Sequence, residues 1–87
     1  MKKTDFEIRK DYIRYFGFET ISDFASAVNE DVSNVWKVLN GKQKPTIEKM
    51  IKYAIVLKVD ISDIITLFYP ESMKKYNRMK TKRRKTK

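Results

Sequence analysis

The sequence predicts an all-α protein, and three observations support that prediction. Apolar residues recur at intervals of three and four along most of residues 1–70. Residues that cap helices stand directly before several of these runs. No stretch of useful length alternates between apolar and polar residues, as a half-buried strand would. With 87 residues, of which 41% are apolar, the chain is long enough for one compact domain.

Five helices are expected, and the first runs from about Asp5 to Phe16. Thr4 and Glu7 have the spacing of a capping box, in which each satisfies a backbone N–H of the other. Gly17 can take the left-handed conformation that ends a helix. The residues expected on the apolar face of this helix are Ile8, Tyr12, Tyr15 and Phe16.

The second and third helices follow closely. Thr20 can cap the second helix, whose apolar stripe would contain Ile21, Phe24, Ala25 and Val28. Asn29 suits a tight turn, because Asn tolerates a positive φ better than most residues. Asp31 or Ser33 can cap the third helix, which must stop by Gly41.

Two further helices complete the expected domain. Pro45 and Thr46 open the fourth helix, which we expect to pack along a face made by Ile47, Met50, Ile51, Ala54 and Leu57. Asp60 begins the fifth helix, whose apolar residues are Ile61, Ile64, Ile65 and Phe68. Pro70 is expected to end the folded part, so that residues 1–70 form the domain and residues 71–87 a flexible tail.

Positive charge is concentrated in that tail. The formal net charge of the chain is +9, of which residues 71–87 contribute +8 (nine Lys and Arg against one acid) and residues 1–70 only +1 (eleven against ten). The first half of the tail can extend as a helix, and its last eight residues are expected to be disordered. Its basic residues would attract phosphates independently of sequence, above all Lys82, Arg83, Arg84 and Lys85.

Composition argues against an enzyme. The chain has no Cys and no His, which removes thiol nucleophiles, imidazole bases and zinc sites built from those ligands. We therefore expect no catalytic residue, no metal and no cofactor. The first residues lack an apolar signal region, and no run approaches the roughly 18 apolar residues of a membrane span. A cytoplasmic protein without a membrane partner is expected.

The stretch from Thr20 to Gly41, "TISDFASAVNEDVSNVWKVLNG", together with the following "KQKPTIEKMIKYAIVLKVDISDIITLF", resembles the Cro and lambda-repressor type of helix-turn-helix domain without a gap. The resemblance covers about Asp5 to Tyr69. The residues that carry it are Phe24, Ala25, Asn29, Val35, Leu39 to Gly41, Pro45, Ala54, Leu57 and Val59. It implies a five-helix domain that lays its third helix in the major groove of DNA, while the start of the second touches the backbone.

The same resemblance implies the site residues. Positions that read bases, or lie near them, would be Val32, Ser33, Asn34, Trp36 and Lys37. Phosphate-contacting positions would be Thr20, Asn40, Lys42 and Lys44. The residue pattern agrees, since burial of Val35, Val38 and Leu39 leaves Ser33, Trp36, Lys37 and Asn40 on the opposite stripe. Lys37 could donate to guanine and Asn34 could pair with adenine.

Three features bear on how the domain would bind its partner. Trp36 could face DNA, fold back over the second or fourth helix, or contact a protein partner. Glu30 and Asp31, next to the groove, would repel phosphates. The fifth helix could form a dimer contact through Ile61, Ile64, Ile65 and Phe68, or simply pack against the first helix.

The function expected from the sequence is a sequence-specific transcription regulator, a repressor of the phage or mobile-element kind, that binds double-stranded DNA as a homodimer. One alternative is a protein-interaction module, such as an antitoxin that binds a toxin or a modulator that binds another regulator. Another is a non-specific nucleic-acid binder that acts through its basic tail.

Overall fold

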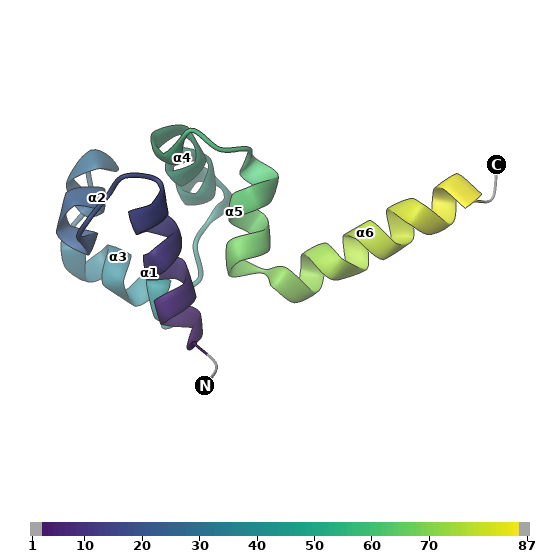
Figure 1. Ribbon diagram of the computed structural model, residues 1–87, viewed down its shortest axis with the longest axis horizontal. Helices are drawn as coiled ribbons and strands as arrows, with labels where there is room; N and C mark the ends of the chain where they lie inside the picture. The colour runs from purple at the N-terminus through teal and green to yellow at the C-terminus, as the bar shows by residue number, and fades with distance from the viewer. Residues whose placement is uncertain (1–2, 86–87) are drawn as a thin grey trace.

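The computed structural model describes the backbone of residues 3–85 and the side chains of residues 3–79. Every regular element in these residues is a helix, which confirms the all-α prediction. The helices are α1 (Asp5–Tyr15), α2 (Ile21–Ala27), α3 (Val32–Leu39), α4 (Ile47–Leu57), α5 (Ile61–Phe68) and α6 (Pro70–Lys85). Helices α1 to α5 form a compact body, and α6 projects away from it as a single helix (Figure 1).

Threonine caps begin three of these helices. The capping box predicted for α1 is confirmed: the Glu7 N–H donates to the Thr4 hydroxyl over 3.1 Å, and the Thr4 N–H donates to the Glu7 carboxylate over 2.8 Å. Thr20 and Thr46 accept in the same way from the third residue of α2 and α4, at 3.0 and 3.1 Å. Because each cap satisfies an N–H that the helix itself leaves unpaired, the sequence sets these three starts locally.

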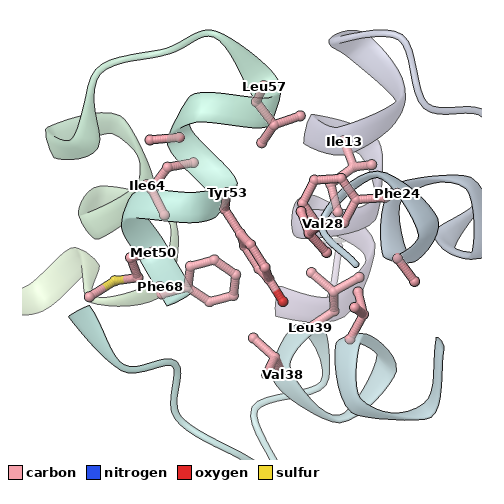
Figure 2. Close-up of a cluster of buried hydrophobic side chains, with 13 residues drawn as sticks. Ile13, Phe24, Val28, Val38, Leu39, Met50, Tyr53, Leu57, Ile64 and Phe68 are labelled. Atoms are coloured by element: carbon pink, nitrogen blue, oxygen red, sulfur yellow. The ribbon is translucent and has the colours of Figure 1, made fainter. Parts of the chain in front are cut away.

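The core lies between α2 and α3 on one side and α4 and α5 on the other. Tyr53 of α4 stands between the two sides, with its ring edge-on to Phe24 of α2 at a centroid distance of 4.8 Å (Figure 2). The buried apolar residues are Ile13, Phe24, Ala25, Val28, Val35, Val38, Leu39, Met50, Tyr53, Ala54, Leu57, Ile64 and Phe68. Burial of this apolar set supplies the main stabilisation of the body.

The predicted apolar face of α1 was largely wrong, since of its four residues only Tyr12 is half-buried against the core. Ile8, Tyr15 and Phe16 are 47%, 83% and 36% exposed, whereas the buried residues of this helix are Arg9 and Ile13. Apolar residues occur on more than one side of α1, so their spacing alone did not identify the side that faces α2 and α3. The body covers the Arg9 side, since the hydrogen bonds of that residue reach α3 and α5.

The predicted packing face of α4 was also partly wrong. Met50, Ala54 and Leu57 are buried as expected, but Ile47 and Ile51 are 60% and 44% exposed. The apolar sector of α4 is wider than the surface that its neighbours cover, and the two isoleucines lie on the uncovered part.

Pro70 begins a helix and does not end the folded part. Proline fits the first turn of a helix, because the N–H that it lacks would be unpaired there anyway. The helix is joined directly to the preceding residue, since the Met73 N–H donates to the carbonyl of Tyr69 over 3.1 Å. Residues 3–85 therefore contain six helices where five were expected, and the helical backbone reaches Lys85, into the segment expected to be disordered.

Candidate nucleic-acid interface

Helix α3 separates a buried face from an exposed one. Val35, Val38 and Leu39 are fully buried in the core. The other side of the helix carries the residues that the sequence analysis selected: Val32, Ser33, Trp36 and Lys37 are exposed, and Asn34 and Asn40 are half-buried. The structure thus brings six candidate positions together on one helix and its C-cap.

The turn before α3 is held by backbone geometry. Asn29 has a φ of 59°, in the left-handed region that Asn tolerates, as the sequence predicted. The Glu30 N–H donates to the carbonyl of Ala25 over 2.9 Å, which returns the chain across the end of α2. Ala25 is 2% exposed, so its small side chain lets α2 and α3 approach closely. Of the two residues expected to cap α3, Asp31 is the N-cap residue. Its side chain forms no capping hydrogen bond.

Glu30 does not present a free negative charge to the surface. Its side chain is only 12% exposed and forms ion pairs with Lys49 and Lys52 of α4, at 3.4 and 3.3 Å. The repulsion of phosphates expected from Glu30 is therefore offset by two lysines within the body, and Asp31 remains as the exposed acid beside α3. The same ion pairs connect the α2–α3 turn to α4.

Trp36 lies against α1. Its ring meets that of Phe6 at a centroid distance of 6.0 Å and an angle of 58°, and the Lys42 ammonium lies 5.3 Å from the Trp36 ring centre. The side chain is still 43% exposed. This ring contact is with α1 and not with α2 or α4, the helices considered in the sequence analysis. Phe6 fixes one side of the indole, and the exposed side remains available to a ligand.

The loop after α3 folds back onto the end of the helix. The Asn40 side-chain amide donates to the carbonyl of Trp36 over 3.0 Å, and the Lys42 N–H donates to the carbonyl of Lys37 over 2.9 Å. Gly41 adopts a φ of 78°, which favours glycine. The side-chain N–H of Asn40 is therefore used at the helix end, whereas Lys42 and Lys44 are exposed. Thr20 caps the start of α2 and is exposed, so its side chain is accessible to a ligand.

Two residues of α1 that the sequence did not indicate border this surface. Phe6 supports Trp36, and the Lys10 ammonium lies 5.9 Å from the Phe6 ring centre. Lys10 and Lys42 thus flank the two rings with positive charge. The spacing of Phe6 and Lys10, four residues apart on a helix, was a signal for their mutual contact, but nothing in the sequence indicated that α1 approaches Trp36.

The remaining candidate residues divide between the core and α6. Ile64 and Phe68 are 0% and 8% exposed, so the prediction that these two residues form a dimer contact was wrong: a side chain inside the core of its own chain has no surface to offer a second copy. Ile61 and Ile65 are half-buried. The backbone of Lys82 to Lys85 belongs to α6, and their side chains lie outside the described part of the structure.

The described residues hold no group of three or more acidic side chains that could bind a metal ion. No helix among them is long and apolar enough to cross a lipid bilayer. Comparison of the chain with protein-family models, with curated proteins and with solved structures gave no match. The function must therefore be argued from the geometry of this surface.

Proposed function

We propose that α1 to α5 form a helix-turn-helix domain of the Cro and lambda-repressor type, and that the protein is a sequence-specific, DNA-binding transcription regulator of the repressor kind. The observation that carries the proposal is the two-sided character of α3. Its apolar side is buried through Val35, Val38 and Leu39, and its other side carries short polar, amide, aromatic and basic groups. An exposed helix of this kind, positioned by a preceding helix and a tight turn, fits the major groove.

Each group on this side of α3 has a chemical use in that groove. The Lys37 ammonium can donate to the O6 and N7 atoms of guanine, and the Asn34 amide can pair with adenine. The Ser33 hydroxyl can form a hydrogen bond with several different bases, and Val32 can contact a thymine methyl group. Trp36, held by Phe6, can pack against sugars or thymine methyl groups with its exposed side.

Phosphate contacts would surround these base contacts. Lys42 and Lys44 are exposed in the loop after α3, and Thr20 is exposed at the start of α2. The ion pairs of Glu30 with Lys49 and Lys52 reduce the repulsion that a free carboxylate would cause. Helix α6 supplies most of the net positive charge and would add attraction that does not depend on base sequence.

Selection from a random pool of DNA duplexes tests the proposal. Full-length protein is incubated with the pool at about physiological salt, where non-specific phosphate binding is weakened, and the bound duplexes are sequenced. We expect an enriched site, and a palindrome with half-sites about 34 Å apart if the protein binds as a dimer. A folded protein that enriches no sequence would contradict the proposal.

Val32 and Trp36 support a second candidate function, recognition of a protein such as a toxin or another regulator. These two apolar side chains are 49% and 43% exposed on one helix, and exposed Trp is enriched at the centres of protein interfaces. Trp36→Ala separates the two functions: loss of a protein partner with the DNA preference retained would favour this candidate. A third possibility, non-specific binding through α6 alone, is tested below by truncation.

A further inference from the structure

Helix α4 carries a row of exposed isoleucines. Ile47, Ile51 and Ile55 are 60%, 44% and 70% exposed, although the other apolar residues of α4 are buried or half-buried. Residues four apart on a helix lie about 6 Å apart along its axis and are rotated by only about 40°, so the three side chains form one continuous row. We refer to Ile47, Ile51 and Ile55 as the isoleucine stripe.

Water contact with the stripe is unfavourable in the isolated chain. Each exposed isoleucine carries apolar area that would gain about 25 cal/mol for every Å² removed from water. Single exposed apolar residues are common on proteins, but a row of three aligned ones on one helix is typical of a contact surface. Among the described residues, α5 packs against α4, and Met50 and Ala54 are buried whereas the stripe stays exposed.

We propose that the isoleucine stripe is the contact between two copies of this chain, in which the two α4 helices pack antiparallel across a two-fold axis beside Ile51. This arrangement places Ile51 against Ile51 of the second copy. Ile47 of each copy then meets Ile55 of the other, so every member of the stripe is covered by a member of the same stripe, as a two-fold interface requires.

The charges beside the stripe fit this arrangement. Glu48 and Lys52 lie on the same side of the stripe, rotated from Ile51 by about 60° and 100°. In the antiparallel pair, Glu48 of one copy lies next to Lys52 of the other, with a separation of about 3 Å along the helix axis. The two-fold symmetry repeats this pair. Glu48 has no ion pair within the described residues, and the Lys52 side chain is 46% exposed although it also contacts Glu30. A parallel pair would instead turn Glu48 toward the Ala54 side of the second copy.

This interface differs from the one that the sequence suggested on α5. Two of the four contributors there, Ile64 and Phe68, are used within the core, whereas all three residues of the stripe are exposed. The stripe is also independent of DNA binding, since it includes none of the candidate DNA-contacting residues.

The first experiment measures the oligomeric state of the full-length protein without DNA, by sedimentation equilibrium at concentrations up to about 0.1 mM, because small interfaces are weak. We expect a monomer–dimer equilibrium. Ile51→Lys places two ammonium groups against each other at the two-fold axis and should raise the dimer dissociation constant by roughly tenfold or more. Ile8→Lys is the matched control, since Ile8 is 47% exposed on α1 and should leave the equilibrium unchanged.

A wild-type protein that stays monomeric at these concentrations overturns the proposal, and so does an Ile51→Lys variant that still dimerises like the control. Circular dichroism shows whether each variant remains folded. Because oligomerisation is measured without nucleic acid, its outcome is separate from that of the DNA selection experiment.

Cross-linking tests the antiparallel direction. The chain has no native cysteine, so single cysteines can be introduced without background. Ile51→Cys should form a cross-linked dimer with a short bis-maleimide, and the Ile8→Cys control should not. Ile47→Cys mixed with Ile55→Cys should cross-link to each other more efficiently than either variant to itself. Efficient self-cross-linking of Ile47→Cys, without the mixed product, would overturn the antiparallel arrangement.

Discussion

At the scale of single residues, Arg9 is the buried charged side chain of the described core. It is 8% exposed, donates to the carbonyls of Leu39 and Leu67 over 3.0 and 3.3 Å, and lies 5.0 Å from the Phe68 ring centre. Leu39 is the last residue of α3 and Leu67 lies in the last turn of α5, where helix dipoles favour a positive charge. The guanidinium therefore joins the ends of α3 and α5 to α1, and it has no carboxylate partner among the described residues.

Replacement of Arg9 should weaken the whole body. Arg9→Met keeps much of the apolar stem but leaves two helix-end carbonyls without their donor, so we expect the free energy of unfolding to fall by about 2 to 4 kcal/mol. Urea denaturation followed by circular dichroism measures this. Arg14→Met, on the exposed side of the same helix, should change stability by less than about 0.5 kcal/mol. Equal effects of the two substitutions would contradict the role given to Arg9.

Tyr53 predicts a dependence of stability on alkaline pH. Burial raises the pKa of the Tyr53 phenol above its ordinary value of 10.0, and the nearby Glu30 charge adds to the effect. The folded state therefore disfavours the phenolate, so this contribution to stability is complete below the ordinary pKa and is lost progressively as pH rises from there through the raised pKa of the folded state. Between about pH 9 and 11, Tyr53→Phe should lose less unfolding free energy than the wild type, as measured by denaturation at each pH. Identical losses would show that Tyr53 does not contribute.

Lys37 tests the proposed reading of bases. Lys37→Ala should cost roughly 1 to 3 kcal/mol on the selected DNA site and relax the preference at one base-pair position. Fluorescence anisotropy with the selected site and its single-base variants measures both effects. Lys42→Ala is a suitable comparison, because a phosphate contact should weaken all sequences about equally. If Lys37→Ala also weakens all sequences equally, Lys37 contacts phosphate and does not read a base.

At the scale of helices, local signals predicted starts and turns better than packed faces. The capping residues Thr4 and Thr20 and the turn residue Asn29 were predicted correctly, because a cap or a turn depends on a few neighbouring atoms. Helix α4 begins directly after Thr46, next to the start expected at Pro45 and Thr46. The inner face of α3 was predicted correctly for the same kind of reason: its three buried residues share one narrow sector.

The faces of α1 and α4 could not be read from spacing, because apolar residues on these helices occupy more than the covered sector. Which part is covered depends on how the neighbouring helices pack, and the same holds for the approach of Phe6 to Trp36. The buried position of Arg9 depends on carbonyl groups that are 30 and 58 residues away in the sequence. Long-range contacts of this kind leave no periodic signal in the chain.

The end of α4 offers a prediction at this scale. Lys58, its C-cap, has a φ of 60°, a left-handed conformation in which a side chain is strained and glycine is not. Lys58→Gly should therefore raise the free energy of unfolding by up to about 1 kcal/mol. Thermal and urea denaturation measure the gain, and Lys58→Ala, which keeps the strain but removes the charge, is the control. Destabilisation by Lys58→Gly would mean that the lysine side chain itself stabilises the cap.

At the scale of the whole molecule, the chain divides into a nearly neutral body and a basic helix that projects from it (Figure 1). Many like charges along α6 repel one another, and its contact with the body is made at α5. Helix α6 therefore adds little to the core and presents its charge at a distance from α3.

Truncation separates the contributions of the two parts. Deletion of residues 74–87 should leave the melting temperature of the body nearly unchanged, because the buried apolar residues all precede this segment. Binding to the selected DNA site should weaken about equally for all sequences, and the dependence of affinity on salt should become less steep. Differential scanning fluorimetry and anisotropy titrations at several salt concentrations measure these effects. Loss of all sequence discrimination would instead favour the tail-only model of binding.

The ion pairs of Glu30 with Lys49 and Lys52 have a consequence for the thermodynamics of recognition. They join the turn before α3 to α4, while Arg9 holds the other end of α3. Both ends of the helix are thus fixed when the protein folds, before any ligand arrives. Whatever meets the exposed face of α3 encounters a preorganised surface, so association there loses little conformational entropy of the backbone.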